Sequence, residues 1–233
     1  MDRPYIVCHM VTSIDGKVTG EFLEQPVSQD SIKLYYEINR MLPSNGFICG
    51  RVTMEGSFTH GWYPDLTAYA PQKTVDFIPE HRSGFYAVAF DTNGRLGWRS
   101  GCIVDEDSGY DGAQIVEVLS ENVDPRYLGY LKSQGIAYVF AGQETIDVTV
   151  ALNKLSTLLG AETLLLEGGS IINGAFQRAN VIDELSIVIA PAVADAVDKP
   201  LFTVSTFTEF ELTDVKRVNG TVVLNYTRKS DVR

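Results

Sequence analysis

The stretch that decides the fold is TLLLEGGSIING, residues 163–174 of a chain of 233. Its apolar run predicts a buried strand that ends at Glu167, and the two glycines permit a sharp turn because neither carries a Cβ atom. Ser170 is predicted to cap the helix that follows. The first turn of such a helix offers free backbone N–H groups, which favour a bound phosphate. A glycine pair chosen only to pack a tight turn would give the same pattern.

Strands and helices are predicted to alternate on both sides of this stretch. From Asp124 onward the expected helices and strands cover residues 124–133, 136–141, 147–159, 163–167, 171–179 and 183–190. This alternation is typical of parallel strands joined by crossover helices. The chain ends differently, because residues 210–218 and 221–228 flank Asn219-Gly220, which predicts an antiparallel hairpin.

The N-terminal half continues the pattern. Residues 4–12 predict a strand, and a helix is expected from Ser28 or Asp30 until Pro43 stops it. Further strands are expected at residues 46–50, 85–91 and 114–119, with a helix starting at Arg51 and a long loop over residues 58–83. We therefore predict an α/β fold with a central, mostly parallel sheet, helices on both faces and a C-terminal antiparallel hairpin. No composition break marks a linker, so one domain over residues 1–233 is expected.

The charge balance limits the ligand classes. Lys and Arg number 19 and Asp and Glu number 30, which gives a net charge of −11. This balance argues against general affinity for nucleic acid or an anionic membrane. The cysteines Cys8, Cys49 and Cys102 lack metal-ligand spacing, and the three histidines are scattered, so no metal site is expected. Residues 1–4 lack the apolar run of a signal peptide, which predicts a soluble, cytoplasmic protein.

Three further positions are candidates for chemistry. Glu167 ends a predicted central strand, where a carboxylate needs a partner or a proton-handling role. Arg51 and Thr53 follow Gly50 at a second strand-to-helix junction, and together they could bind a phosphate. Asp15 lies in an Asp-Gly turn, a weak signal by itself. His9 on the first strand is interpreted from its context as a satisfied, half-buried imidazole.

Several of these motifs resemble those of one known family. The residues that carry the resemblance are Pro4-Tyr5-Ile6-Val7, Ser13-Ile14-Asp15-Gly16-Lys17, Gly50-Arg51-Val52-Thr53, Asp147, Leu164 to Gly169, Asn173-Gly174 and Asp183-Glu184-Leu185. They are similar to the reductase domain of bacterial riboflavin biosynthesis, which has the dihydrofolate-reductase-like fold. The similarity runs from about Pro4 to the last hairpin. No zinc-deaminase pair of HxE and PCxxC motifs is present.

The resemblance implies NADPH-dependent reduction of the ribosylamino group of a phosphorylated pyrimidine, similar to 5-amino-6-(5-phosphoribosylamino)uracil, to a ribitylamino group. It implies that Asp15 and Glu167 face the substrate. The residues that it places around the pyrophosphate and the nicotinamide are Gly142, Gly168, Gly169, Ser170 and Ile171. Gly50, Arg51 and Thr53 would meet the adenosine phosphate, including the 2′-phosphate. Relatives commonly form homodimers, so a homodimer is expected here.

Two departures from the family pattern leave alternatives open. Members that make riboflavin commonly carry a lysine where this chain has His9, so His9 is a candidate replacement whose charge would depend on pH near neutrality. The residues after Thr53 also differ from the usual Gly-Thr and Asn-Pro element. The chain could therefore be a reductase of the same fold that acts on a pterin or another heterocycle, or a non-catalytic nucleotide-binding module.

Overall fold

The computed structural model describes residues 2–229, and these residues divide into two compact units. The first unit contains residues 2–4 and 44–164, and the second contains residues 5–43 and 165–229. Each unit is therefore assembled from separate segments of the chain. The single domain over residues 1–233 stays a prediction.

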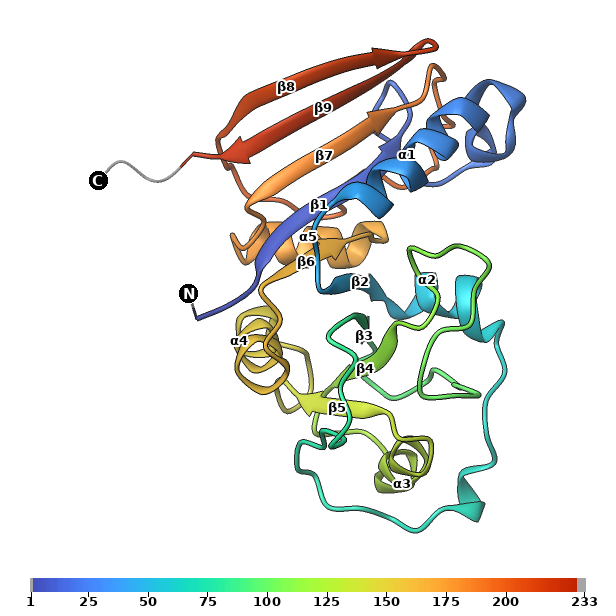
Figure 1. Cartoon of the computed structure of the whole chain (residues 1–233), viewed down its shortest axis with the longest axis vertical. Helices are drawn as coiled ribbons and strands as arrows, with labels where there is room; N and C mark the ends of the chain where they lie inside the picture. The colour runs from blue at the N-terminus through green and yellow to red at the C-terminus, as the bar shows by residue number, and fades with distance from the viewer. Residues whose placement is uncertain (1, 230–233) are drawn as a thin grey trace. The chain divides into compact units, whose positions relative to one another are not determined.

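The first unit contains a four-stranded parallel sheet in the order β5-β4-β3-β2 (Figure 1). Its strands are β2 (Gly46–Gly50), β3 (Tyr86–Phe90), β4 (Gln114–Leu119) and β5 (Ala137–Phe140). Its helices are α2 (Arg51–Met54), α3 (Pro125–Ser133) and α4 (Val148–Leu159). The strands are almost continuously apolar because both faces of this sheet are buried.

Local sequence signals explain the helix ends of this unit. The Asp124 carboxylate accepts a hydrogen bond from the Arg126 N–H at 2.8 Å, and Asp147 does the same for the Thr149 N–H at 2.8 Å. Gly160 ends α4 with φ of +71°, a left-handed conformation that suits glycine. Helix α2 is only four residues long and continues as a π-helical turn over Glu55–Thr59.

The second unit contains strands in the order β6-β1-β7-β9-β8. Strand β1 (Tyr5–Thr12) pairs in parallel with β7 (Glu184–Ile189), with Val7 opposite Glu184. Strands β7, β9 (Thr221–Arg228) and β8 (Phe210–Val218) are antiparallel. Strand β6 (Thr163–Leu166) crosses the sequence boundary between the units. Helix α1 (Gln29–Met41) packs against β1 and β7, and α5 (Ser170–Arg178) follows β6 (Figure 1).

The predicted elements are confirmed, including the mostly parallel sheet and the final hairpin. Asn219 and Gly220 both have positive φ, of +47° and +85°, as a two-residue type I′ turn requires. The buried side chains of α1 are polar, although an amphipathic helix usually buries apolar ones. Its buried residues are Ser31 and Asn39, because polar groups of neighbouring elements bind both side chains.

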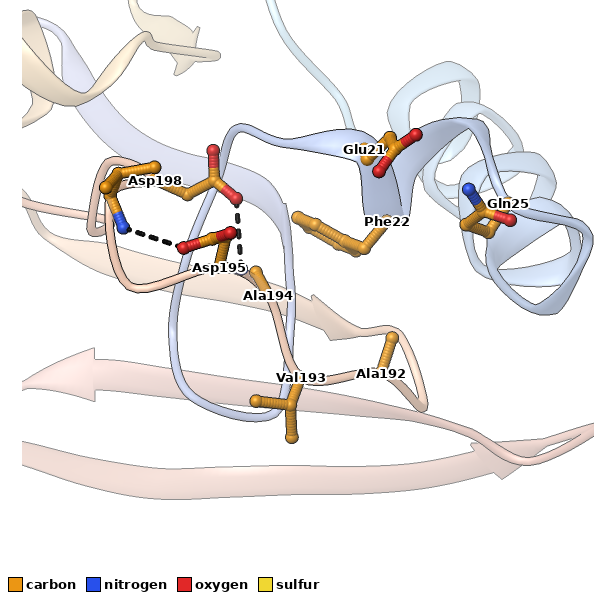
Figure 2. A pocket seen from close by; sticks show the side chains of 9 residues that line it. Glu21, Phe22, Gln25, Ala192, Val193, Ala194, Asp195 and Asp198 are labelled. Atoms are coloured by element: carbon orange, nitrogen blue, oxygen red, sulfur yellow. Dashed lines mark hydrogen bonds between the residues drawn. The ribbon is translucent and has the colours of Figure 1, made fainter.

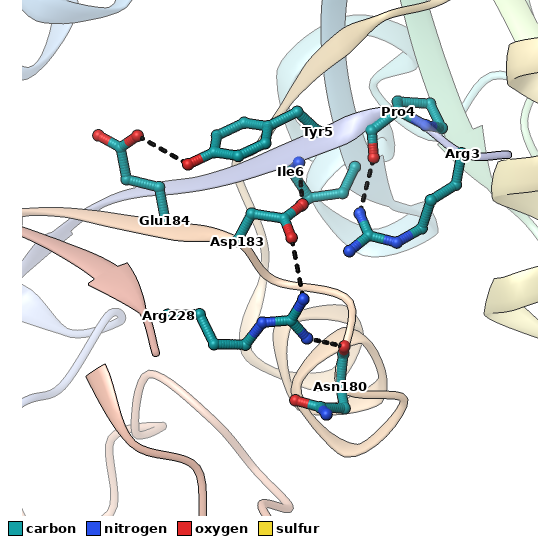
Figure 3. A network of polar contacts seen from close by, with 8 residues as sticks. All are labelled: Arg3, Pro4, Tyr5, Ile6, Asn180, Asp183, Glu184 and Arg228. Atoms are coloured by element: carbon teal, nitrogen blue, oxygen red, sulfur yellow. Dashed lines mark hydrogen bonds and ion pairs between the residues drawn. The ribbon is translucent and has the colours of Figure 1, made fainter. Parts of the chain in front are cut away.

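An ion-pair network connects the start of β1 to the start of β7 and the end of β9 (Figure 3). The Asp183 carboxylate accepts hydrogen bonds from the Ile6 N–H at 2.9 Å and from the Arg228 guanidinium at 3.1 Å. Arg228 also donates to the Asn180 carbonyl. These residues come from distant parts of the sequence, and the network links three strands that are neighbours in the sheet.

Within residues 2–229, no helix is both long enough and apolar enough to cross a membrane. Cys8 and Cys49 are buried and Cys102 is exposed, and none of the three forms a disulfide within residues 2–229.

Candidate functional site

Glu167 follows β6 directly and is only 8% exposed. Its Oε1 accepts a hydrogen bond of 2.5 Å from Nδ2 of Asn39, which is 6% exposed on α1. A buried carboxylate needs such a donor, since burial removes its water. Asn39 is not among the predicted site residues, although an amide in line with Ile32 and Tyr35 of the same helix is a usable signal. The contact fixes the direction of the Glu167 side chain.

The glycine pair forms a cradle in the second unit. Gly168 has φ of +90°, and a Cβ atom there would lie 3.1 Å from the Met10 methyl carbon and 3.6 Å from Nδ2 of Asn173. Asn173 is fully buried, and neither polar atom of its side chain has a hydrogen-bond partner among the described residues. A buried amide without partners is costly unless a bound group satisfies it. The cradle and Asn173 therefore fit a polar ligand such as the amide or pyrophosphate of a nicotinamide dinucleotide.

Ser170 lies in the cradle, but its hydroxyl has a different role from the predicted one. Gly169 is the N-cap of α5, and Ser170 is the first residue of the helix. The Ser170 hydroxyl donates to the Pro200 carbonyl and lies 2.8 Å from the Thr203 hydroxyl. The prediction that Ser170 caps α5 is therefore wrong, because its hydroxyl binds the segment after β7 instead of the helix N–H groups. Ile171 is 66% exposed on the first turn of α5.

His9 is fully buried in β1. Its ring stacks on Tyr35 with centroids 4.3 Å apart, Nδ1 lies 3.0 Å from the Ser186 hydroxyl, and Nε2 lies 3.0 Å from the Tyr35 carbonyl. Burial lowers the pKa of His9 from 6.5 to about 4, although the hydrogen bonds to the backbone carbonyls of Tyr35 and Ser186 oppose the shift. The prediction that the charge of His9 changes near neutral pH is therefore wrong. The catalytic role of His9 stays a prediction, and it would involve a neutral imidazole.

The buried His9 leads to a stability prediction. Between pH 6.5 and pH 4 the unfolded chain binds a proton at this position that the folded protein does not, so stability falls as the pH falls. We expect the free energy of unfolding to drop by about 2 kcal/mol from pH 7 to pH 5 through His9. Urea denaturation followed by circular dichroism should show this drop. His9→Gln should remove it, and His81→Gln, at an exposed histidine, should keep it; an equal drop in both variants would contradict the prediction.

Asp15 lies in the turn after β1 and is solvent-exposed. Its Oδ1 accepts hydrogen bonds from the Ser13 hydroxyl at 2.6 Å and from the Ala194 N–H at 3.0 Å. The Ser13 hydrogen bond, followed by that of Ala194, lowers the pKa of Asp15. Asp15 is thus an ionised hydrogen-bond acceptor at neutral pH, a property that suits orienting a substrate better than delivering a proton.

A cavity of about 440 Å³ lies beside this turn (Figure 2). It is formed by the short helix Glu21–Glu24 with Gln25, and by residues 192–198 after β7. Glu21, Asp195 and Asp198 contribute carboxylates, and Phe22 contributes an apolar wall. Such a surface would accept hydrogen bonds from amino groups and would repel a phosphate.

The remaining predicted residues belong to the first unit. Gly50 is the N-cap of α2, and Thr53 is half-buried on that helix. The Arg51 guanidinium donates to Glu55 at 2.6 Å. Arg51 is therefore already paired with a carboxylate one turn along the helix, which the sequence analysis did not anticipate. A phosphate at this position would have to compete with Glu55.

Gly142 follows β5 with φ of +131°. A Cβ atom there would lie 2.1 Å from the Thr145 carbonyl oxygen, and the Gly142 carbonyl accepts a hydrogen bond from the Glu121 N–H. The turn itself therefore requires glycine, and the contact of Gly142 with a cofactor stays a prediction.

The predicted site residues are distributed over both units. His9, Asp15 and residues 167–171 belong to the second, where β6 and β1, the strands before Glu167 and Asp15, are neighbours in the sheet. Gly50, Arg51, Thr53 and Gly142 belong to the first. Asn39 and Asn173 are the additions that the structure makes to the predicted set.

Comparison with known proteins gives consistent matches. The family model described as the RibD C-terminal domain matches residues 4–224. The chain is 24% identical over 197 residues to the 2,5-diamino-6-ribosylamino-4(3H)-pyrimidinone 5′-phosphate reductase of Methanothermobacter thermautotrophicus, covering 84% of this chain and 82% of the relative. It is 25% identical over 208 residues to the protein of the same name from Aquifex aeolicus, covering 86% and 82%.

Solved structures share the fold. A pyrimidine reductase-like protein from Corynebacterium diphtheriae superposes with a TM-score of 0.68 at 17% identity, over 98% of this chain and 93% of that one. RibD of Acinetobacter baumannii gives a TM-score of 0.67 at 17% identity, over 98% of this chain. The present chain spans 59% of the length of that protein. These likenesses confirm the predicted α/β fold, which this chain shares with both proteins.

Proposed function

Because the chain belongs to the RibD C-terminal domain family, we propose that it is an NADPH-dependent reductase of riboflavin biosynthesis. Its substrate would be a phosphorylated ribosylaminopyrimidine, whose sugar is reduced to a ribityl group. The observation that carries this proposal is the family match over residues 4–224, together with two curated relatives that are named for this reaction.

The cradle at Gly168 supports the cofactor part of the proposal. Gly168 packs against Met10 and Asn173, and the unpartnered amide of Asn173 offers a donor and an acceptor. The N–H groups at the start of α5 favour the negative charge of a pyrophosphate. A nicotinamide bound there would supply the hydride.

We assign Glu167 and Asp15 two different roles at the substrate. The reduction adds a hydride to the sugar carbon of an opened imine, so a proton must also reach the imine nitrogen. We assign the proton-handling role to Glu167, whose direction Asn39 fixes. We assign substrate orientation to Asp15, because its hydrogen bonds favour the ionised form.

The substrate assignment is tested by following NADPH absorbance. The ribosylaminopyrimidine phosphate should drive its loss, whereas dihydrofolate should not. Turnover of dihydrofolate instead would favour a pterin reductase. Cofactor binding without turnover of either compound would favour a non-catalytic nucleotide-binding module.

The proposed role of Arg51 gives a second prediction. We expect NADPH to raise the melting temperature more than NADH does, because Arg51 would bind the additional 2′-phosphate. Arg51→Ala should weaken NADPH binding roughly tenfold and leave NADH binding unchanged, so that the two temperature shifts become similar.

Arg126→Ala provides the control, since it removes an exposed arginine of the same unit. This variant should keep the full preference for NADPH. Equal shifts for the two cofactors in the unchanged protein would remove the assignment of Arg51 to the 2′-phosphate.

The homodimer stays a prediction. The outer strand β8 exposes apolar side chains that a second copy could cover, among them Leu212 at 49% and Val215 at 53%.

A further inference from the structure

Two buried carboxylates lie in the first unit, which contains none of the residues predicted to be catalytic. Glu117 belongs to β4 and is fully buried, and Asp91 follows the neighbouring strand β3 and is 1% exposed. The strands are paired, with Ala89 opposite Glu117. The proposed reaction uses neither side chain, so their burial needs a separate explanation.

The two carboxylates have different donors. Asp91 Oδ2 accepts hydrogen bonds from the backbone N–H groups of Arg95 and Leu96. Glu117 Oε1 accepts one from Nε1 of Trp98, and it lies 3.3 Å from the Tyr127 hydroxyl. That hydroxyl also donates to the Leu96 carbonyl at 2.8 Å, and it has a single hydrogen for both contacts. Asp91 is therefore the better stabilised anion.

The other oxygen of each carboxylate is unsatisfied. Within residues 2–229, neither Oδ1 of Asp91 nor Oε2 of Glu117 has a hydrogen-bond partner. The two carboxylates are linked through Leu96, whose N–H donates to Asp91 and whose carbonyl accepts from the Tyr127 hydroxyl that also contacts Glu117. Two buried like charges in such a cluster are unfavourable, and a single proton removes one of them and supplies a donor. We propose that Glu117 holds this proton in the folded protein at neutral pH and that Asp91 remains ionised.

The surrounding groups agree with this assignment. Burial, followed by the charge of Asp91, raises the pKa of Glu117 well above its ordinary value. Burial also raises the pKa of Asp91, but its backbone hydrogen bonds and the Arg51 guanidinium oppose that shift. The other titratable groups that act on the pair or its tyrosines are Tyr63, Tyr69, Tyr127, Tyr130, Arg95 and Asp124. None of these is a cation placed directly against Glu117.

The proton on Glu117 has a consequence for Arg51. This consequence rests on the proposed function, which assigns Arg51 to the 2′-phosphate. With Glu117 neutral, Asp91 is the charged member of the pair and attracts the Arg51 guanidinium from the end of β3. Glu55 binds the same guanidinium from α2. Asp91 therefore adds negative charge to the surroundings of the arginine that we assign to the 2′-phosphate.

The proton itself can be tested without any cofactor. Both tryptophans, Trp62 and Trp98, lie in the first unit, so their fluorescence during urea denaturation follows the unit that contains Glu117. A proton that only the folded state retains makes unfolding easier as the pH rises. The ratio of the unfolding constants, unchanged protein over Glu117→Gln, should therefore rise about tenfold per pH unit above pH 5.5. A ratio that does not change with pH would overturn the proposal.

Two further measurements assign the proton. Glu121→Gln, at an exposed carboxylate just after β4, should keep the pH dependence of the unchanged protein. The infrared carbonyl band of a protonated carboxyl group should be present at pH 7 in the unchanged protein and in Asp91→Asn, and absent in Glu117→Gln. A band lost only in Asp91→Asn, or missing from the unchanged protein, would overturn the assignment even if Glu117→Gln did not fold.

The outcome is separable from that of the proposed function. If the proton is found but the protein binds no NADPH, only the proposed function fails. If NADPH is preferred over NADH but the infrared band is missing, only the buried proton fails.

Discussion

Replacement of Glu167 by glutamine is expected to lower kcat by about 100- to 1000-fold, because an amide cannot transfer a proton to the imine nitrogen. The affinity for NADPH should change less than about twofold, since the cradle at Gly168 is untouched. The fold should persist, because the glutamine carbonyl can still accept the hydrogen bond from Asn39. Steady-state kinetics and cofactor titration on the same preparation measure both quantities.

Glu162→Gln is the matched control, since Glu162 is an exposed carboxylate just before β6. It should have the activity of the unchanged protein. A Glu167→Gln enzyme with unchanged kcat and raised KM would show that Glu167 only binds the substrate. Unchanged values of both parameters would remove Glu167 from the site.

Asp183→Ala is expected to lower the free energy of unfolding by about 3 kcal/mol. The substitution leaves the mostly buried Arg228 guanidinium without its carboxylate and the Ile6 N–H without its acceptor. Urea denaturation followed by circular dichroism measures the loss. When Arg228→Ala is added to Asp183→Ala, it should lower the free energy of unfolding much less than Arg228→Ala does alone, because the two residues act as one network.

Glu209→Gln supplies the comparison for this network. Its partner Lys229 lies 3.7 Å away, and both side chains are more than half exposed, so the loss should stay below about 0.5 kcal/mol. Similar small losses for Glu209→Gln and Asp183→Ala would mean that the network in Figure 3 contributes little to stability.

Local signals were sufficient for the elements of the fold. The apolar run before Glu167 predicted β6, and Asn219-Gly220 predicted the turn between β8 and β9, because both patterns act through the backbone of a few neighbouring residues. The division into two units could not be predicted in this way, since it depends on contacts between residues far apart in the sequence.

The site was predicted less completely for the same reason. Glu167 and Gly168 stand in one motif, whereas Asn39 reaches Glu167 across 128 positions of the sequence. Ser170 had the right residue type for a cap, but the Pro200 carbonyl and Thr203 compete for its hydroxyl. The buried pair of Asp91 and Glu117 is likewise assembled only when β3 and β4 come together.

The place of β1 in its sheet has a consequence for biosynthesis. This strand precedes both of its sheet neighbours in the sequence, since β6 begins at Thr163 and β7 only at Glu184. Residues 44–164 can form their own sheet before β7 has been synthesised. Nascent chains that stall before Glu184 therefore leave one edge of this apolar strand unpaired, which makes them prone to aggregate or to need a chaperone.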